Sequence, residues 1–498
     1  MGILLTAPIL VPLGASLLLF TLRGRRQASH IVAAIASTIL LGLSSWLTVR
    51  VAREGLLVVS IGSWPPPYGI VLVADLLSAL MLLVCTFVSW ATVLYSTAWI
   101  DPGREQMGYY SLIFALLVGV NGAFLTGDIF NLYVWFEVLL VSSFVLLVLG
   151  AERGQVEGGL KYVALNLLAS SFFLSAVGVL YGVAGTLNLA HLSLRLPRLD
   201  PLVLDLLAVL FGIAFGIKAG VFPLFFWLPA SYHTPPVPVS ALFAGLLTKV
   251  GVYSLIRVFT LLFVHDPGWS HRLLLACAAL TMVTGVLGAL AQQDVRRILS
   301  FHIVSQIGYM VFGLALLTPL GLASSVFYIV HHIIVKTNLF LIGGLIERSG
   351  GSSLLAELGG LYRARPWLGL IFLVPALSLA GLPPLSGFIA KLLVIRAGLN
   401  AGAFWATAVA VVVSLFTLLS MLKIWNQAFW TPASTRLDTA NPLPARVVVP
   451  VIALAFATVI LGLWGEPFLA LSKHAADQLL DSRAYQEAVL GKLPTSSP

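Results

Sequence analysis

Long apolar runs follow one another along almost the whole chain, separated by short polar or charged segments. A helix needs about 20 apolar residues to cross the hydrocarbon core of a bilayer, and most of the runs reach that length. The pattern therefore predicts an all-α membrane protein with about 14 spans. We expect these spans at approximately 3–22, 30–50, 74–98, 108–126, 128–150, 160–183, 203–222, 238–263, 272–292, 299–318, 321–346, 367–396, 402–428 and 446–468.

Three segments need a separate interpretation within what we expect to be a single polytopic domain, 1–498. In residues 56–72, β-branched residues flank the Trp-Pro-Pro-Pro turn at 64–67, which is typical of a hairpin and here of an extramembrane one. From Lys473 onward the chain is polar, and we expect one short surface helix. Arginines such as Arg23 follow the first apolar run instead of preceding it, which favours an uncleaved first span over a signal peptide.

The composition agrees with lipid as the solvent. Hydrophobic residues make up 59% of the chain and charged residues 9%, whereas soluble domains carry roughly 25% charged residues. The net charge of +9 fits basic loops on the cytoplasmic side of a membrane better than it fits nucleic-acid binding. With the N-terminus outside, Lys and Arg are more frequent in the loops that would lie inside, and an even number of spans places both ends outside.

Six basic residues fall inside the expected spans, where a charge is costly. Arg257 and Lys423 are near helix ends, and we expect their long side chains to reach the membrane surface. The remaining four require another explanation. They are Lys218, Lys249, Lys336 and Lys391.

Glu137 is the only acid that we expect deep inside an apolar span. A carboxylate there should face a polar interior and either pair with a cation or be protonated part of the time. The alternative is a static ion pair that holds two helices together. A pair that opens and closes would instead act as a proton switch.

Two similar segments indicate broken helices. Residues 219–224 (AGVFPL) resemble residues 380–385 (AGLPPL) at an offset of 161 positions, and both lie in long apolar spans. Transporters place ion sites at such breaks. Lys218 precedes the first break and could pair with Glu137, whereas Lys391 follows the second and could instead cap helix carbonyls.

Lys249 and Lys336 lie near the middle of their spans, and His332 is four residues before Lys336, so these last two share a helix face. An imidazole beside an amine inside a membrane can pass protons. The alternatives are a snorkelling Lys249 and a structural His332. The neighbouring His331 suggests metal binding as a further alternative, but no third ligand stands at helical spacing. We therefore expect no metal and no cofactor.

Together, these motifs resemble the antiporter-type subunit family. That family includes proton-pumping membrane subunits of respiratory complex I, related membrane hydrogenases and Mrp (multiple resistance and pH) cation/proton antiporters. The resemblance implies 14 helices arranged as two inverted five-helix repeats with broken helices, at about 108–263 and 272–428. The matching pieces are Phe136-Glu137, Lys218 before its proline, Lys249, residues 292–299, His332 with Lys336, and Ser386-Gly387-Phe388 with Lys391.

Within the family, residues 127–137 and 62–70 look most like the D-type subunits of Mrp antiporters. The resemblance implies that Glu137 and Lys218 form a coupling pair and that Lys391 is a far site. Lys249, His332 and Lys336 would form the relay between them. The second half has no obvious glutamate that matches Glu137.

The resulting hypothesis is a secondary transporter subunit, and not an enzyme, that exchanges Na+ for protons with the membrane potential as driving force. The resemblance implies protons, Na+, the lipid bilayer and the other Mrp subunits (A, B, C, E, F and G) as partners, and no nucleic acid. Two alternatives remain open: a proton-pumping subunit of a redox-driven complex, and a structural assembly subunit with static ion pairs.

Overall fold

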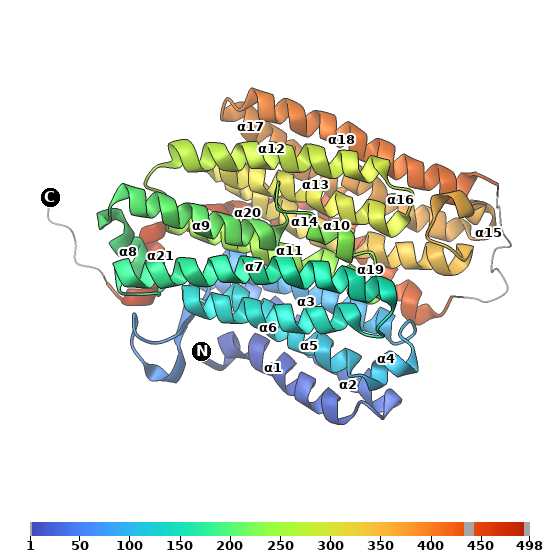
Figure 1. Ribbon diagram of the computed structural model, residues 1–498, viewed down its shortest axis with the longest axis horizontal. Coiled ribbons are helices and arrows are strands. Elements are labelled where there is room, and N and C mark those ends of the chain that lie inside the picture. The colour runs from blue at the N-terminus through green and yellow to red at the C-terminus, as the bar shows by residue number, and fades with distance from the viewer. Residues whose placement is uncertain (1, 433–442, 493–498) are drawn as a thin grey trace.

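The computed structural model describes residues 2–432 and 443–492, and it confirms an all-α membrane fold. Within these ranges, 12 helices are long and apolar enough to cross a membrane. The two other predicted spans contain shorter apolar helices, α5 (Tyr109–Leu125) and α16 (Pro366–Ala380). Each of the predicted apolar runs therefore contains a helix, and the long helices lie roughly side by side (Figure 1).

The 12 long helices are α1 (Gly2–Thr21), α2 (Arg26–Glu54), α3 (Leu76–Ser96), α6 (Ile129–Val148), α7 (Arg153–Ala184), α9 (Pro201–Ala219), α11 (Val237–Leu261), α12 (Pro267–Ala291), α13 (Val295–Ala315), α14 (Pro319–Gly350), α18 (Phe404–Trp425) and α19 (Ala445–Leu463). Helix α17 (Ser386–Asn400) has 15 residues and follows α16 within the same predicted span. Shorter helices connect or follow them: α4 (Pro102–Gln106), α8 (Leu189–Arg195), α10 (Trp227–Ser231), α15 (Leu361–Ala364), α20 (Gly465–Leu480) and α21 (Ser482–Leu490).

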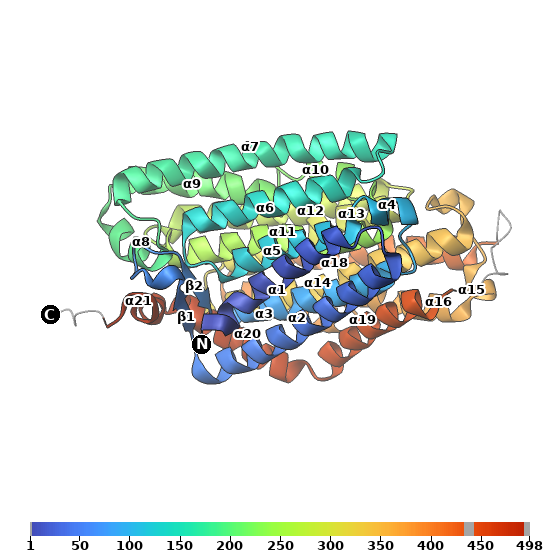
Figure 2. The same cartoon turned by 90° about the horizontal axis from the view of Figure 1, so that it is seen from below.

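The bundle has two distinct ends (Figures 1 and 2). One end, which we call the hairpin end, carries α8, α21 and two antiparallel strands, β1 (Leu57–Ser60) and β2 (Val71–Ala74). The strands pair in the register Leu57 to Ala74, so the hairpin extends two residues beyond the segment 56–72 for which we expected it. The opposite end, the α4 end, carries α4 and α15, and our charge analysis predicts that it faces the cytoplasm.

Helices α11 and α14 occupy the centre of the bundle. Every residue in the most apolar stretch of each is buried, whereas fewer than half of the residues in the corresponding stretches of α2, α7 and α12 are buried. Helix α14 packs against α3, α11, α13, α16, α17, α19 and α20. Ionisable residues on these two helices are therefore shielded from lipid by the surrounding helices.

Both predicted helix breaks are present. Helix α9 ends at Ala219 and α16 ends at Ala380, and each is followed by a glycine in the left-handed region, Gly220 at φ 79° and Gly381 at φ 91°. Glycine suits this position because it has no Cβ to clash with the preceding carbonyl. The chain is non-helical at 221–226 and again at 382–385.

Paired features relate the two halves. Asp128 caps α6 and pairs through its backbone with Asn188, while Asp294 caps α13 and pairs with Leu354. From 128 to 294 and from 188 to 354 the shift is 166 positions, and α7 and α14 each have 32 residues. The first pairing lies beside α8 and the second near α15, at opposite ends of the bundle (Figure 1).

The polar tail differs from our prediction of one surface helix. It forms two helices, and α20 packs against α3 and α14. The side chain of Gln478 accepts a hydrogen bond from the backbone N–H of Leu76 at 2.8 Å. The prediction was wrong because α20 is amphipathic: it buries Ala475, Ala476 and Leu479 and presents a polar outer face. The average polarity of a segment does not reveal such an apolar face.

Candidate functional site

Glu137 on α6 and Lys218 on α9 are connected through a serine. The hydroxyl of Ser170, on α7, donates a hydrogen bond to Glu137 Oε1 at 2.5 Å and accepts one from Lys218 Nζ at 3.1 Å. Lys218 Nζ also lies 5.4 Å from the centroid of the Phe136 ring. The two residues that the sequence suggested as a pair are thus brought together, with a hydroxyl group between them.

The position of Lys218 follows from close packing of α9 on α11. Gly251 lies against the backbone of Lys218 and Ala219, and a Cβ at this glycine would be only 2.5 Å from the nitrogen of Ala219. Only a residue without a side chain allows this approach. The last turn of α9, which carries Lys218, therefore packs against α11 at Gly251, two residues after Lys249.

Lys249, His332 and Lys336 lie in the fully buried centre. Lys249 Nζ donates a hydrogen bond to the carbonyl of Ala244. Close packing of Gly245 on Thr337 holds α11 and α14 together here.

Among the described residues, the amine of Lys336 and both ring nitrogens of His332 have no hydrogen-bond partner. Buried polar groups are normally satisfied by protein or by ordered water. The hydrogen-bonding capacity of His332 and Lys336 is therefore unused by the described protein groups, and an imidazole and an amine can both accept and release a proton.

Lys391 lies at the second break. Its Nζ donates to the carbonyl of Ala380 at 2.9 Å and to the hydroxyl of Ser414 at 2.9 Å. The Ala380 carbonyl has no helical partner because α16 ends there. The capping geometry that we considered as an alternative is therefore present, and the amine also reaches a hydroxyl that could carry a proton onward.

Further polar groups lie between the centre and this break. His331 Nδ1 is 2.8 Å from Ser386 Oγ, which is 3.1 Å from Ser378 Oγ. His302 Nε2 is 2.8 Å from Ser420 Oγ. In the described residues, no direct hydrogen bond joins Lys218 to Lys249, or Lys336 to Lys391.

Arg257 corrects one prediction. Its guanidinium Nη2 is 2.6 Å from Asp75 Oδ2, and both side chains are buried, so Arg257 does not reach the membrane surface. The C-terminal helix α21 covers Arg257: the guanidinium carbon of Arg257 lies 5.6 Å from the centroid of the Tyr485 ring. Asp75 also shows that Glu137, itself only partly buried, is not the only acid inside the bundle.

Lys423 lies at a helix end, as we expected. Its Nζ donates to the carbonyls of Leu290 and Gln292, at 3.0 and 2.7 Å. These are carbonyls at the end of α12, where no helical donor remains. Lys423 therefore has a structural role in joining α18 to α12.

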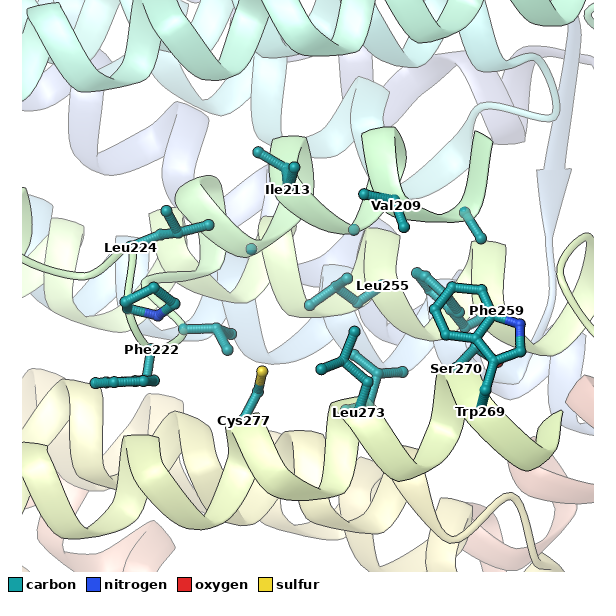
Figure 3. Close-up of a pocket in the computed structure, with 16 residues that line it drawn as sticks. Val209, Ile213, Phe222, Leu224, Leu255, Phe259, Trp269, Ser270, Leu273 and Cys277 are labelled. Atoms are coloured by element: carbon teal, nitrogen blue, oxygen red, sulfur yellow. The ribbon is translucent and has the colours of Figure 1, made fainter. Parts of the chain in front are cut away.

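An apolar crevice lies beside the first break, between α9, α11 and α12 (Figure 3). Phe222, Leu224 and Leu255 line it together with Cys277. None of the residues that line it is charged. It therefore suits lipid chains and not an ion path.

A polar cleft lies at the α4 end, lined by Asp101, Arg104, Glu152, Gln155 and Glu347, among others. Arg104 pairs with Glu152 and, at 2.7 Å, with Asp101. Burial alone would raise the pKa of Asp101, but the hydrogen bonds from Arg104 lower it below its ordinary value. In the ranges described, no three His, Cys, Asp or Glu side chains gather as a metal site would require.

Comparisons with known proteins agree on one family. Residues 126–417 match the family model described as "NADH:quinone oxidoreductase/Mrp antiporter, TM". The chain is 45% identical to the D-type subunit of the Na(+)/H(+) antiporter of Alkalihalophilus pseudofirmus, over 98% of this chain and 100% of that protein.

Solved structures are similar over almost the whole chain. One chain in the structure of the Mrp complex from a Dietzia species matches with a TM-score of 0.94 and 34% identity, covering 99% of this chain and 100% of that one. One chain of the membrane-bound sulfane sulfur reductase, an archaeal respiratory membrane complex, matches with a TM-score of 0.90 and 28% identity, covering 98% and 99%.

Proposed function

This chain belongs to the NADH:quinone oxidoreductase/Mrp antiporter family, and on that premise we propose that it is the D-type, proton-translocating subunit of a multisubunit Na+/H+ antiporter. It is a multi-pass protein of the bacterial cell membrane and a transporter subunit, not an enzyme. The other subunits of the complex are its partners. The support is the full-length similarity to a D-type antiporter subunit and to a chain of a solved Mrp complex.

The proposed proton relay consists of Glu137 with Lys218, then Lys249, then His332 with Lys336, and Lys391 at the far break. The observation that carries the proposal is the pair His332 and Lys336, fully buried and without protein hydrogen-bond partners in the described structure. A permanently charged amine at such a position would be strongly unfavourable. An amine that gains and loses a proton avoids most of that cost.

We also propose that residues 108–263 and 272–428 are two inverted five-helix repeats. The matched caps at Asp128 and Asp294 and the matched breaks at Gly220 and Gly381 support this division. Each repeat then contains one broken helix with a lysine beside the break, Lys218 in one and Lys391 in the other.

The redox-driven alternative has less support. The similarity to the respiratory membrane complex is 28% identity, against 45% to the D-type antiporter subunit. Membrane vesicles that contain the whole complex separate the two: an antiporter dissipates a pH gradient when Na+ is added, without any electron donor.

The proposed relay is tested by Glu137→Gln and Lys218→Ala in such vesicles. We expect each to lower the Na+-dependent dissipation of the pH gradient at least about 10-fold, because removing a proton-transfer group typically costs 100-fold or more. Glu54→Gln is the matched control, since Glu54 pairs with Arg50 near the surface. Normal exchange by both relay variants in assembled complexes would support the structural-subunit alternative.

A further inference from the structure

Ser170 occupies a position that the sequence did not single out. A serine hydroxyl can donate one hydrogen bond through its proton and accept others through its lone pairs. Here it donates to Glu137 and accepts from Lys218, so it uses both capacities at once. The next residue, Ser171, instead faces outward and donates to the carbonyl of Leu167 on its own helix, which is the usual arrangement in membrane helices.

The buried face of α7 changes character at Ser170. Between the α4 end and this residue, the buried side chains include three polar ones, Gln155, Tyr162 and Asn166. Beyond Ser170, the buried residues are all apolar: Phe173, Ala176, Val177, Leu180 and Ala184. Ser170 is thus the last polar residue on this face.

Aromatic rings cover the pair on the hairpin side. The Phe173 ring lies 5.9 Å from Phe136, 5.8 Å from Phe211 and 4.8 Å from Phe215, measured between centroids. Helix α9 runs from Pro201 toward its break, so Phe211 and Phe215 both precede Lys218 on the hairpin side. An apolar layer of this kind resists the entry of water to the pair from the hairpin side.

Polar groups continue from Ser170 toward the α4 end. The Tyr162 hydroxyl is 2.6 Å from Ser143 Oγ, and the Asn166 amide donates to the Tyr162 carbonyl at 2.9 Å. Gln155, near the start of α7, lines the polar cleft at that end, and its buried Oε1 has no partner among the described residues. Ser170 is therefore the innermost polar residue of a helix face that begins at this cleft.

The related helix in the second half supports the same position. Helix α14 matches α7 in length, and its start is displaced from that of α7 by the same 166 positions as the matched caps, 153 to 319. The counterpart of Ser170 is Lys336, one of the fully buried lysines at the centre. In both halves, then, this helix position contributes a proton-carrying group.

We propose that Ser170 is a proton-relay residue through which Glu137 and Lys218 exchange a proton. In the transfer, an N–H bond of the Lys218 ammonium breaks as its proton bonds to Ser170 Oγ, while the Oγ–H bond breaks as that proton bonds to Glu137 Oε1. The products are a neutral amine, a neutral carboxylic acid and an unchanged hydroxyl, so the total charge is conserved and nothing is oxidised. The inference rests on the proposed function.

The test uses the assembled complex in proteoliposomes, with Na+/H+ exchange followed by a pH-sensitive dye. We expect Ser170→Ala to lower the maximal rate about 10- to 100-fold and to leave the Na+ concentration for half-maximal rate unchanged. Ser170→Thr keeps the hydroxyl and should retain most of the rate. Ser171→Ala, the same change one residue away, should be within about 2-fold of the unmodified complex, since that hydroxyl only bonds its own helix.

Two results would overturn the inference. One is a normal exchange rate for the Ser170→Ala complex while the separate Glu137→Gln complex is inactive. That result would support the proposed function but exclude a role for Ser170 in proton transfer. The other is an equal loss in Ser170→Ala and Ser170→Thr, which would assign the effect to packing. A normal rate for Glu137→Gln would overturn both this inference and the proposed function.

Discussion

At the scale of single residues, arginine and lysine have different roles in this bundle. Arg257 is buried in an ion pair with Asp75, and a guanidinium stays charged at any accessible pH. Lys249 and Lys336 are buried without a carboxylate partner in the described structure, and a lysine amine can lose its proton when buried. Arginine therefore serves a fixed contact, and lysine serves positions where the charge can change.

The ion pair between Arg257 and Asp75 should contribute to the stability of the folded protein. We predict that Arg257→Gln lowers the free energy of unfolding by about 3–5 kcal/mol, because Asp75 would remain buried without its partner. Arg50→Gln, in the more exposed pair with Glu54, should leave the free energy of unfolding nearly unchanged, because water screens an exposed ion pair. Thermal or denaturant unfolding of the detergent-solubilised complex measures both, and equal losses in the two variants would contradict the assignment.

The sequence predicted most of the candidate site at this scale, because an ionisable residue in an apolar run is conspicuous. Ser170 and Asp75 were missed for physical reasons. Serine is common in membrane helices and usually forms a hydrogen bond with the backbone of its own helix. A serine in an apolar run therefore does not by itself indicate a functional site. Asp75 stands at the edge of an apolar run, where a helix cap is the ordinary explanation, and only the fold shows that α11 brings Arg257 to it.

At the scale of helices, the breaks and the close contacts set the geometry of the relay. Both breaks were predictable because Gly and Pro recur at matching positions, and both follow a left-handed glycine. The packing of Gly251 on Lys218 was not predictable, since a glycine inside a helix does not indicate which neighbour approaches it. The same holds for α20, whose contacts with α3 and α14 depend on tertiary structure.

The Gly251 contact can be tested directly. Gly251→Ala would place a Cβ 2.5 Å from the nitrogen of Ala219, so α9 and α11 must separate. We predict a loss of about 1–3 kcal/mol in stability and slower exchange, because Lys218 moves with the last turn of α9. Gly178→Ala is the control: nothing lies within 4 Å of its position, and it should be neutral or gain about 0.5–1 kcal/mol. Equal behaviour of the two variants would show that this contact does not constrain the bundle.

At the scale of the whole molecule, the two halves share a frame and differ in chemistry. The caps, the long helices and the breaks correspond. The position 166 residues after Glu137 is Ile303, and the one after Ser170 is Lys336. In the proposed relay, a carboxylate therefore stands only in the first half. We expect proton exchange between an acid and an amine in that half, and exchange among amines and imidazoles in the centre and the second half.

The fold class could be predicted from apolar length alone, because helices satisfy their own backbone hydrogen bonds inside lipid. In the described residues, 12 helices reach spanning length, and two of the 14 predicted runs contain only shorter helices. The central position of α11 and α14 could not be predicted in this way. Their sequences are no more apolar than those of α12 or α19, so their complete burial follows from how the halves pack and not from local composition.

Infrared difference spectroscopy on the assembled complex tests the central claim most directly, namely that these buried groups change their charge during turnover. The spectrum before and after Na+ addition is compared between the unmodified complex and Glu137→Gln. We predict a carboxylic-acid band that changes with Na+ in the unmodified complex and is absent from the variant. A carboxyl signal from Glu137 that stays constant while the complex exchanges Na+ for protons would contradict the account.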